Sequence, residues 1–376
     1  MFERLRHMLI KEFLQVLRDP RMKGVLFAMP VIQMLVFGYA VTTDVRHVPT
    51  AIYDLDHSQS SRNLVAAFVK SGYFDVVTYV DNDDEARDLV DHGRALAVLR
   101  LDHGFENDLL AGRTAAAQLI LDGTDSNTAG IVLAYSGAIA RQFSNAVLLD
   151  TFTRTRGLPP RLATVDLQSR AWFNDNLESR NFYIPGVIAA IVTLVTLLLT
   201  SMAVVREKEI GTMEQIMVTP ITPAEFILGK TLPFALISLV DVALITLVGT
   251  LWFDVPIRGN LPILLAGVLI YLVTTLGVGL LISTVCRTQQ QAMMSTFFFY
   301  FPAFLLSGFI FPIANMPEPV QWLTYLNPLR YFLVIIRGIF LKGVGLEILW
   351  PHMAALAVLG LCTLWLATRR FHKTLA

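Results

Sequence analysis

Long apolar segments, separated by charged stretches, dominate the pattern along this chain. A helix that crosses a membrane needs about 20 mostly apolar residues, because its backbone groups find no water in the bilayer and must pair within the helix. Six segments meet this requirement: residues 24–42, 182–205, 232–252, 261–285, 292–311 and 348–367. A further apolar stretch, 329–341, is too short to span and contains Arg330 and Arg337. The pattern predicts an α-helical polytopic membrane protein with six transmembrane helices.

The stretch between the first two spans, residues 43–181, has the pattern of a water-soluble domain. Apolar runs predict strands at 50–53, 74–79, 95–101 and 117–121, and helical patterns occupy 58–71, 83–92, 104–111 and 126–156. Such alternation predicts an inserted α/β domain with helices against a sheet. The stretch contains no Gly-rich phosphate loop, and we assign it no chemistry.

Residues 1–23 predict a helix on the surface of the membrane. Apolar side chains recur at helical spacing on one side: Phe2, Leu5, Leu9, Phe13, Val16 and Leu17. Arg4, Lys11 and Arg18 share the other side, and Asp19-Pro20 ends the pattern. The segment lacks the apolar core and cleavage site of a signal peptide, so we expect an amphipathic interfacial helix.

Basic residues near the span ends predict the orientation. Lys and Arg residues are concentrated before residue 24 and after residue 367. Cytoplasmic flanks of membrane helices carry this excess. With six crossings, both termini are predicted to be cytoplasmic, which places residues 43–181 on the periplasmic or extracellular side.

Composition excludes several classes of function. The chain has 30 Lys and Arg against 30 Asp and Glu, and no concentrated basic face for a nucleic acid. Its two cysteines, Cys286 and Cys362, lie in or beside apolar segments, so the soluble block has no disulfide framework. The histidines have no metal-ligand spacing. We therefore predict no metal site and no catalytic residues.

One pattern resembles a nucleotide site and is rejected on physical grounds. Residues 224–231 end in Gly229-Lys230-Thr231, as a relaxed phosphate-loop template does. A phosphate loop exposes backbone N–H groups and needs glycine within the loop, whereas Glu225 and Phe226 stand there. If ATP drives this protein, another chain hydrolyses it.

The segment 206–230, between the second and third spans, carries the strongest functional pattern. It starts as a charged run, and Gly211-Thr212 can end one helix and cap the next. Met residues then give a short helix an adaptable apolar face that suits docking into a partner's groove. The candidate docking residues are Arg206, Glu207, Glu209, Gly211, Thr212, Met213, Glu214, Ile216 and Met217.

This segment and two others resemble segments of the type-2 ABC exporter permeases. The resemblance covers essentially the whole chain. The run from Arg206 to Lys230 is similar to the coupling-helix segment of that family, and Lys11-Glu12 to its interfacial helix. Residues 312–346 look like its re-entrant outer hairpin between helices 5 and 6, with these candidate exit residues: Pro312, Pro317, Asn327, Pro328 and Arg330.

The resemblance implies a permease subunit in a bacterial inner membrane that exports a small molecule, drug or lipid-like substrate. It implies an ATP-binding cassette ATPase as partner, which binds the ATP and Mg²⁺, so that this chain holds no cofactor and its segment 206–230 couples to the ATPase. It also implies a second permease subunit, in a homo- or heterodimer. A periplasmic adaptor is a further candidate partner.

Three residues within the spans are candidates for the transport pathway: Asp241, Phe298 and Tyr300. A charge at the position of Asp241 is costly in a bilayer unless it is paired or wetted. Two interpretations stay open: Asp241 lines the pathway or carries a proton, or it is buried neutral or bonded to Ser238 as a packing element. In the aromatic run 297–301, only some rings can face a pathway, because the run circles its helix.

Two alternative functions fit parts of the pattern. An ion-gradient-driven secondary transporter would use Asp241 and need no ATPase. A membrane receptor would sense a ligand through the domain at 43–181, but it usually has one or two spans and a cytoplasmic output domain. The presence or absence of an associated ATPase discriminates between these functions and the exporter.

Overall fold

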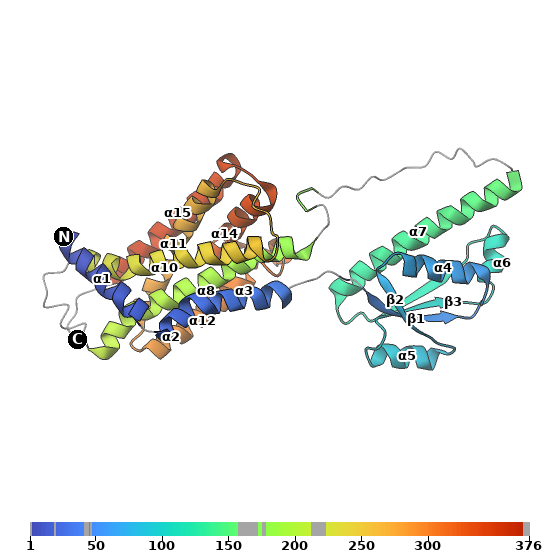
Figure 1. Cartoon of the computed structure of the whole chain (residues 1–376), viewed down its shortest axis with the longest axis horizontal. Helices are drawn as coiled ribbons and strands as arrows, with labels where there is room; N and C mark the ends of the chain where they lie inside the picture. The colour runs from blue at the N-terminus through green and yellow to red at the C-terminus, as the bar shows by residue number, and fades with distance from the viewer. Residues whose placement is uncertain are drawn as a thin grey trace. The chain divides into compact units, whose positions relative to one another are not determined.

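The chain forms two compact units in a computed structural model, shown in Figure 1. The structure describes residues 2–18, 20–40, 45, 47–156, 172–174, 178–211 and 223–370. One unit contains residues 43–169, and the other combines 1–42 with 170–376. Each unit is described by itself.

The unit 43–169 is an α/β domain built on a four-stranded mixed sheet. Its strands are β1 (Val48–Asp54), β2 (Phe74–Tyr79), β3 (Ala97–Leu101) and β4 (Ala117–Leu121), in the order β2-β1-β3-β4. Strand β1 runs parallel to β2 and β3, and β4 runs antiparallel to β3. Its helices are α4 (Gln59–Lys70), α5 (Asp83–Asp91), α6 (Phe105–Leu110) and α7 (Ser126–Arg156).

Both faces of this sheet are covered by helices. Ile52 packs with Leu64 of α4 and Val132 of α7, whereas its neighbour Tyr53 packs on the opposite side with Ala86 of α5. Successive side chains of a strand point to opposite faces, which gives this division. The α/β prediction is confirmed, and every predicted strand and helix is found with bounds within two residues.

The second unit is a bundle of apolar helices. They are η1 (Gly24–Ala28), α3 (Met29–Ala40), α8 (Ser179–Ile210), α10 (Pro223–Leu251), α11 (Leu261–Val285), α12 (Gln289–Leu305) and α15 (Leu346–Arg370). Helix α8 packs against α3, α10, α11 and α12, and α11 packs against α15 (Figure 1). The core between α8 and α11 is apolar, and includes Ile188 and Tyr271.

Four of the six predicted spans are long and apolar enough to cross a membrane within the described residues: α8, α10, α11 and α15. The first predicted span is a shorter apolar helix, Leu26–Ala40. The fifth, predicted over 292–311, ends earlier, at Leu305. Gly308 then adopts a φ of +84°, a left-handed conformation that does not continue a right-handed helix.

The hairpin after α12 consists of short helical pieces: η2 (Ile313–Asn315), α13 (Glu318–Thr324), α14 (Pro328–Arg337) and η3 (Gly338–Lys342). Helix α14 packs against α8, α11 and α15, and the Phe332 ring stacks on Tyr271 with centroids 4.0 Å apart. The short apolar stretch 329–341 is thus a buried helical element. Its re-entrant placement in a membrane stays a prediction.

The amino-terminal segment forms α1 (Phe2–Arg18) and α2 (Pro20–Lys23). Helix α1 lies against α10, and Phe13 packs beside a cluster that includes Leu26 and Phe234. Ile10 and Leu14 are exposed. The predicted helix is therefore present, and one side of it packs on the bundle.

Candidate functional site

A buried ion cluster joins α1, α8 and α10. The Lys230 Nζ lies 2.6 Å from Glu12 Oε1 and 2.6 Å from Glu207 Oε1. All three side chains are buried, with exposed fractions of 1%, 2% and 5% respectively. Lys11, which is half exposed, adds its Nζ at 3.3 Å from Glu207 Oε1. We call Glu12, Glu207 and Lys230 the charged hub.

The hub depends on mutual compensation of charge. A buried charge that loses its partner costs several kcal/mol, so both carboxylates depend on the Lys230 ammonium that lies between them. Its three residues come from an amphipathic helix, the end of one long helix and the start of another. The hub therefore fixes how these three elements meet.

The two residues that follow Glu207 bind two further helices. The Lys208 Nζ donates to the carbonyl oxygens of Ser283 at 3.0 Å and Thr284 at 3.3 Å, at the end of α11. Glu209 Oε2 accepts hydrogen bonds from Gln289 N and Nε2, both at 2.9 Å, at the start of α12. Cations at a helix C-terminus and anions at an N-terminus are favoured by the helix dipole. The end of α8 is thereby bonded to α1, α10, α11 and α12.

The candidate docking residues fall into two groups in the structure. Arg206 is exposed, Glu207 and Glu209 bond to other helices of this chain, and Gly211 ends α8 with a φ of +81°. The others lie outside the described residues: Thr212, Met213, Glu214, Ile216 and Met217.

Sequence reasoning missed two members of the hub. Glu12 is a charged residue within the amphipathic helix, and Lys230 is a charged residue at the start of an apolar span. A charge at either position is unusual and could have indicated a buried ion pair. Lys230 belongs to the rejected nucleotide pattern. In the structure, two carboxylates engage its ammonium inside the protein.

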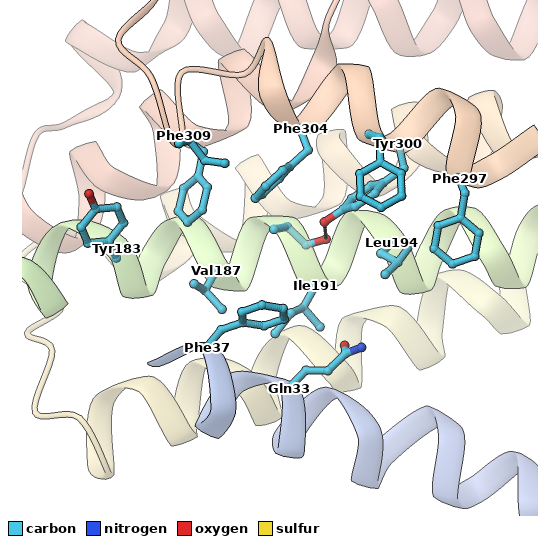
Figure 2. Close-up of a pocket in the computed structure, with 13 residues that line it drawn as sticks. Gln33, Phe37, Tyr183, Val187, Ile191, Leu194, Phe297, Tyr300, Phe304 and Phe309 are labelled. Atoms are coloured by element: carbon cyan, nitrogen blue, oxygen red, sulfur yellow. Dashed lines mark hydrogen bonds between the residues drawn. The ribbon is translucent and has the colours of Figure 1, made fainter. Parts of the chain in front are cut away.

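A second feature is an apolar cavity of about 540 Å³ between α3, α8 and α12, shown in Figure 2. This volume is in the range of pockets that hold small organic molecules. Its lining includes Gln33 and Phe37 of α3, and Phe309 and Ile310 beyond the end of α12. Helices α8 and α12 supply the rest: Tyr183, Val187, Ala190, Ile191, Leu194, Phe297, Tyr300, Phe301 and Phe304.

Aromatic rings form one wall of this cavity. The ring centroids of Tyr300 and Phe304 are 5.7 Å apart, those of Phe304 and Phe309 5.1 Å, and those of Phe309 and Tyr183 5.9 Å. The Tyr300 hydroxyl donates to the Ala190 carbonyl at 3.3 Å, so it is satisfied within the protein (Figure 2). The wall offers apolar area and ring faces rather than charge.

The three predicted pathway residues have different locations. Tyr300 lines the cavity, whereas Phe298 is 83% exposed and is not part of the lining. Asp241 lies on α10, outside this lining, and is buried without a hydrogen-bond partner for either carboxylate oxygen among the described residues. The Ser238 hydroxyl instead accepts from Thr196 Oγ1 at 3.1 Å. The bond to Ser238, one of the interpretations left open for Asp241, is thus not formed.

The predicted exit residues shape the hairpin. Asn327 caps α14 through a hydrogen bond from Leu329 N to its Oδ1 at 3.1 Å, and its Nδ2 donates to Ala303 O at 2.6 Å. Pro328 occupies the first turn of α14, where a missing N–H costs nothing, and Pro312 and Pro317 precede η2 and α13. The Arg330 guanidinium donates to Thr324 Oγ1 and lies 4.0 Å from the Tyr325 ring centroid.

The described residues contain no group of three or more His, Cys, Asp or Glu side chains placed to hold a metal ion. The features with possible function are therefore the charged hub, the aromatic cavity and the hairpin, all within the helical unit.

Comparison with known proteins identifies the family. The family model described as "ABC-2 family transporter protein" matches residues 24–369. The chain is 34% identical to the probable multidrug ABC transporter permease YbhR of Escherichia coli K12 over 96% of this chain and 95% of that protein. It is 33% identical to the probable multidrug ABC transporter permease YbhS of the same strain, over 98% and 97%. It is 30% identical to the inner membrane transport permease YhhJ of that strain, over 97% and 96%.

These matches confirm the resemblance of the chain to the ABC exporter permeases. Permeases of this family lack a nucleotide-binding domain and are typically membrane subunits without a cofactor, so an ABC transporter permease implies a partner ATPase. The chain belongs to the ABC-2 family of transporter proteins and is a permease subunit of an ABC transporter.

Proposed function

We propose that this permease exports small apolar or amphiphilic molecules across a bacterial inner membrane, driven by ATP hydrolysis on a separate ATPase. Two of its relatives are named as probable multidrug permeases and one as an inner membrane transport permease. The aromatic cavity has the size and chemistry for such a molecule. A secondary transporter and a receptor are set aside, because family membership implies an ATPase.

The observation that carries the coupling part of this proposal is the charged hub. Segment 212–222 connects the end of α8 to the start of α10, and Glu207 and Lys230 on its two sides are 2.6 Å apart. A force applied to this segment by an ATPase reaches both helices together. It also reaches α11 and α12, because Lys208 and Glu209 are bonded to them.

The cavity is connected to the same helices. Helix α8 carries Glu207 at one end and cavity residues such as Val187 and Ile191 further along, and α12 starts at the Glu209 contact and carries Tyr300. A shift of α12 against α8 changes the cavity directly. Coupling to ATP requires that the two arrangements differ in substrate affinity or access.

The arrangement in the membrane follows the sequence pattern. We assign α3 and α12 to the first and fifth spans beside the four longer helices, with both termini cytoplasmic. The α/β unit then lies on the periplasmic side, and the hairpin of residues 312–346 lies at the exit. A second permease subunit completes the transporter, and a periplasmic adaptor is a further candidate partner.

Co-purification tests the proposal. The full-length chain is expected to capture an ATP-binding cassette ATPase from its native membrane, and the complex to transport a fluorescent apolar dye in vesicles only with ATP. Charge reversal at Glu214 (Glu214→Lys), in the proposed docking segment, is expected to lower ATPase capture several-fold. Glu85→Lys, an exposed position in the α/β unit, serves as the matched control and is expected to have no effect.

Two results would overturn the proposal. One is dye transport that needs an ion gradient and no ATPase. The other is equal ATPase capture by the wild type and by Glu214→Lys, which would remove segment 206–230 from the interface.

A further inference from the structure

Arg337 places a positive charge beside the aromatic cavity. It is the last residue of α14, and its guanidinium Cζ lies 3.8 Å from the Phe182 ring centroid and 5.8 Å from that of Phe309. Phe309 lines the cavity, as does Tyr183, which follows Phe182 on α8. Phe309 therefore lies both in the cavity wall and beside this guanidinium.

The hydrogen-bonding capacity of Arg337 is mostly unused. Its Nη1 donates to the Gly308 carbonyl at 3.3 Å. Its Nε and Nη2 are buried and have no hydrogen-bond partner among the described residues. No ion pair between Arg337 and a carboxylate occurs in that part of the chain either. Buried donors are nearly always paired, so these two nitrogens are available to an acceptor supplied by a ligand.

A glycine lets this guanidinium and the Phe309 ring approach α8 closely. Gly186 on α8 faces Phe309 and Arg337, and a Cβ at this position would lie 3.3 Å from Arg337 Nη2 and would overlap the Phe309 ring. The ring of Phe309 and the guanidinium thus pack directly against the backbone of α8.

We propose that Arg337 is the anion-binding end of this cavity, and that the transporter takes amphipathic organic anions. The apolar body of the substrate occupies the aromatic cavity, and its carboxylate, sulfonate or phosphate replaces Phe309 as the neighbour of the guanidinium. The inference rests on the proposed function, in which this cavity holds the exported molecule. Among the residues that the structure describes, the cavity lining contains no charged side chain, so Arg337 decides which sign of charge is accepted.

Guanidinium chemistry fits this role. Arg presents several N–H donors in a fixed plane and binds carboxylate or phosphate through two parallel hydrogen bonds. Nε and Nη2, the two unpaired nitrogens, form one edge of that plane. A cationic substrate would meet repulsion at the same place.

The test is binding of a matched probe set to the full-length chain in phosphatidylcholine nanodiscs. The probes are dansylaminoundecanoic acid, its neutral primary amide and the corresponding amine. We expect the acid to bind at least tenfold more tightly than the amide, and the amine most weakly. Added phosphatidylglycerol tests a lipid source of the anion, because a lipid headgroup at this site would compete with the acid and not with the amide.

Substitutions assign the effect to Arg337. Arg337→Gln is expected to weaken binding of the acid tenfold or more and to leave the amide unchanged, whereas Arg337→Lys retains part of the preference. Arg258→Gln is the matched control, because Arg258 is exposed and is not part of the cavity lining. It is expected to leave both affinities unchanged.

The inference is overturned if the wild type does not discriminate the acid from the amide, or if Arg337→Gln weakens both probes equally. The second result would show a packing role only. If Arg337→Gln does not fold, the probe preference of the wild type and of Arg337→Lys decides. Failure here leaves ATPase capture and ATP-dependent transport of the amide intact, whereas failure of the proposed function removes both.

Discussion

The Lys230 ammonium lies 2.6 Å from the Glu207 carboxylate, so the residues on either side of segment 212–222 are joined by a buried ion pair. Glu12, on α1, lies at the same distance from Lys230 and binds the same ammonium. Three elements that are far apart in the sequence therefore meet at one ammonium group. We infer that the hub positions segment 212–222 and does not itself contact a partner.

Replacement of Lys230 by methionine is expected to destabilise the helical unit by about 3–5 kcal/mol, because Glu12 and Glu207 would lose the buried ammonium between them and keep only the half-exposed Lys11. Lys11→Met is the matched control. Lys11 is half exposed, and its pairs are expected to contribute at most about 1 kcal/mol. Thermal unfolding of the purified protein in detergent measures both. Equal effects of the two substitutions would contradict the hub.

Gly186→Ala is expected to disturb the cavity. Its methyl group would overlap the Phe309 ring and press on Arg337, and overpacking of this kind costs about 1–3 kcal/mol. We expect several-fold weaker binding of the neutral dansyl amide, measured by fluorescence titration. Gly345→Ala adds a methyl group in open space and serves as the control. If Gly186→Ala binds the amide as tightly as the wild type does, Phe309 does not form part of the cavity wall.

Tyr300→Ala and Phe298→Ala separate the two sides of α12. Tyr300 lines the cavity and Phe298 points away from it. Loss of the Tyr300 ring is expected to weaken amide binding several-fold, because it removes a large part of the aromatic wall. Phe298→Ala is expected to leave binding to the single chain unchanged. A larger effect of Phe298→Ala than of Tyr300→Ala would show that the substrate binds outside this cavity.

The α/β unit is expected to have a local stability that depends on pH through Asp56. Burial by itself would raise the pKa of Asp56, but hydrogen bonds from Ser58 and from the backbone of Glu106, Gly104 and Phe105 outweigh it, and the pKa is lowered from 3.8. A carboxyl whose pKa is lower in the folded state stabilises the fold above its unfolded pKa, and this stabilisation is lost as the pH falls through the folded pKa.

We therefore expect the amides at the start of α6 to lose protection from hydrogen exchange as the pH falls below 3.8, the ordinary pKa of Asp, after correction for intrinsic rates. Gly104 N donates to Asp56 Oδ1 at 2.7 Å, so this amide reports directly. In Asp56→Ala the amide is expected to be unprotected already at pH 5. Asp91→Ala, an exposed position, is expected to behave as the wild type. If the protection of these amides in the wild type does not change with pH, Asp56 does not have this role.

Local structure could be predicted well because it depends on short-range periodicity. The strand at Phe74–Tyr79, the helix at Ser126–Arg156 and the span at Leu261–Val285 were found at the predicted positions, since alternation and apolar length are properties of the segment itself. The fifth span was predicted too long. Composition alone did not reveal that Gly308 turns into the left-handed region before the apolar run is complete.

The site could be predicted only in part. The pattern singled out Glu207, Glu209 and Tyr300 as residues of interest, and they lie at the hub, beside it and in the cavity wall. It did not predict the partners of Glu207, and it did not distinguish Tyr300 from Phe298. A ring of aromatic residues around a helix has no preferred side until the neighbouring helices are in place.

By itself, the sequence determined which segments are apolar helices, which block is an α/β domain, and which family the motifs resemble. Only the tertiary structure decided that Lys230 lies between Glu12 and Glu207, and that Arg337 lies behind Phe309 with donors to spare. The reason is physical. Periodicity acts over a few residues along the chain, whereas the pairing of buried charges and the shape of a cavity depend on the packing of segments that are distant in sequence.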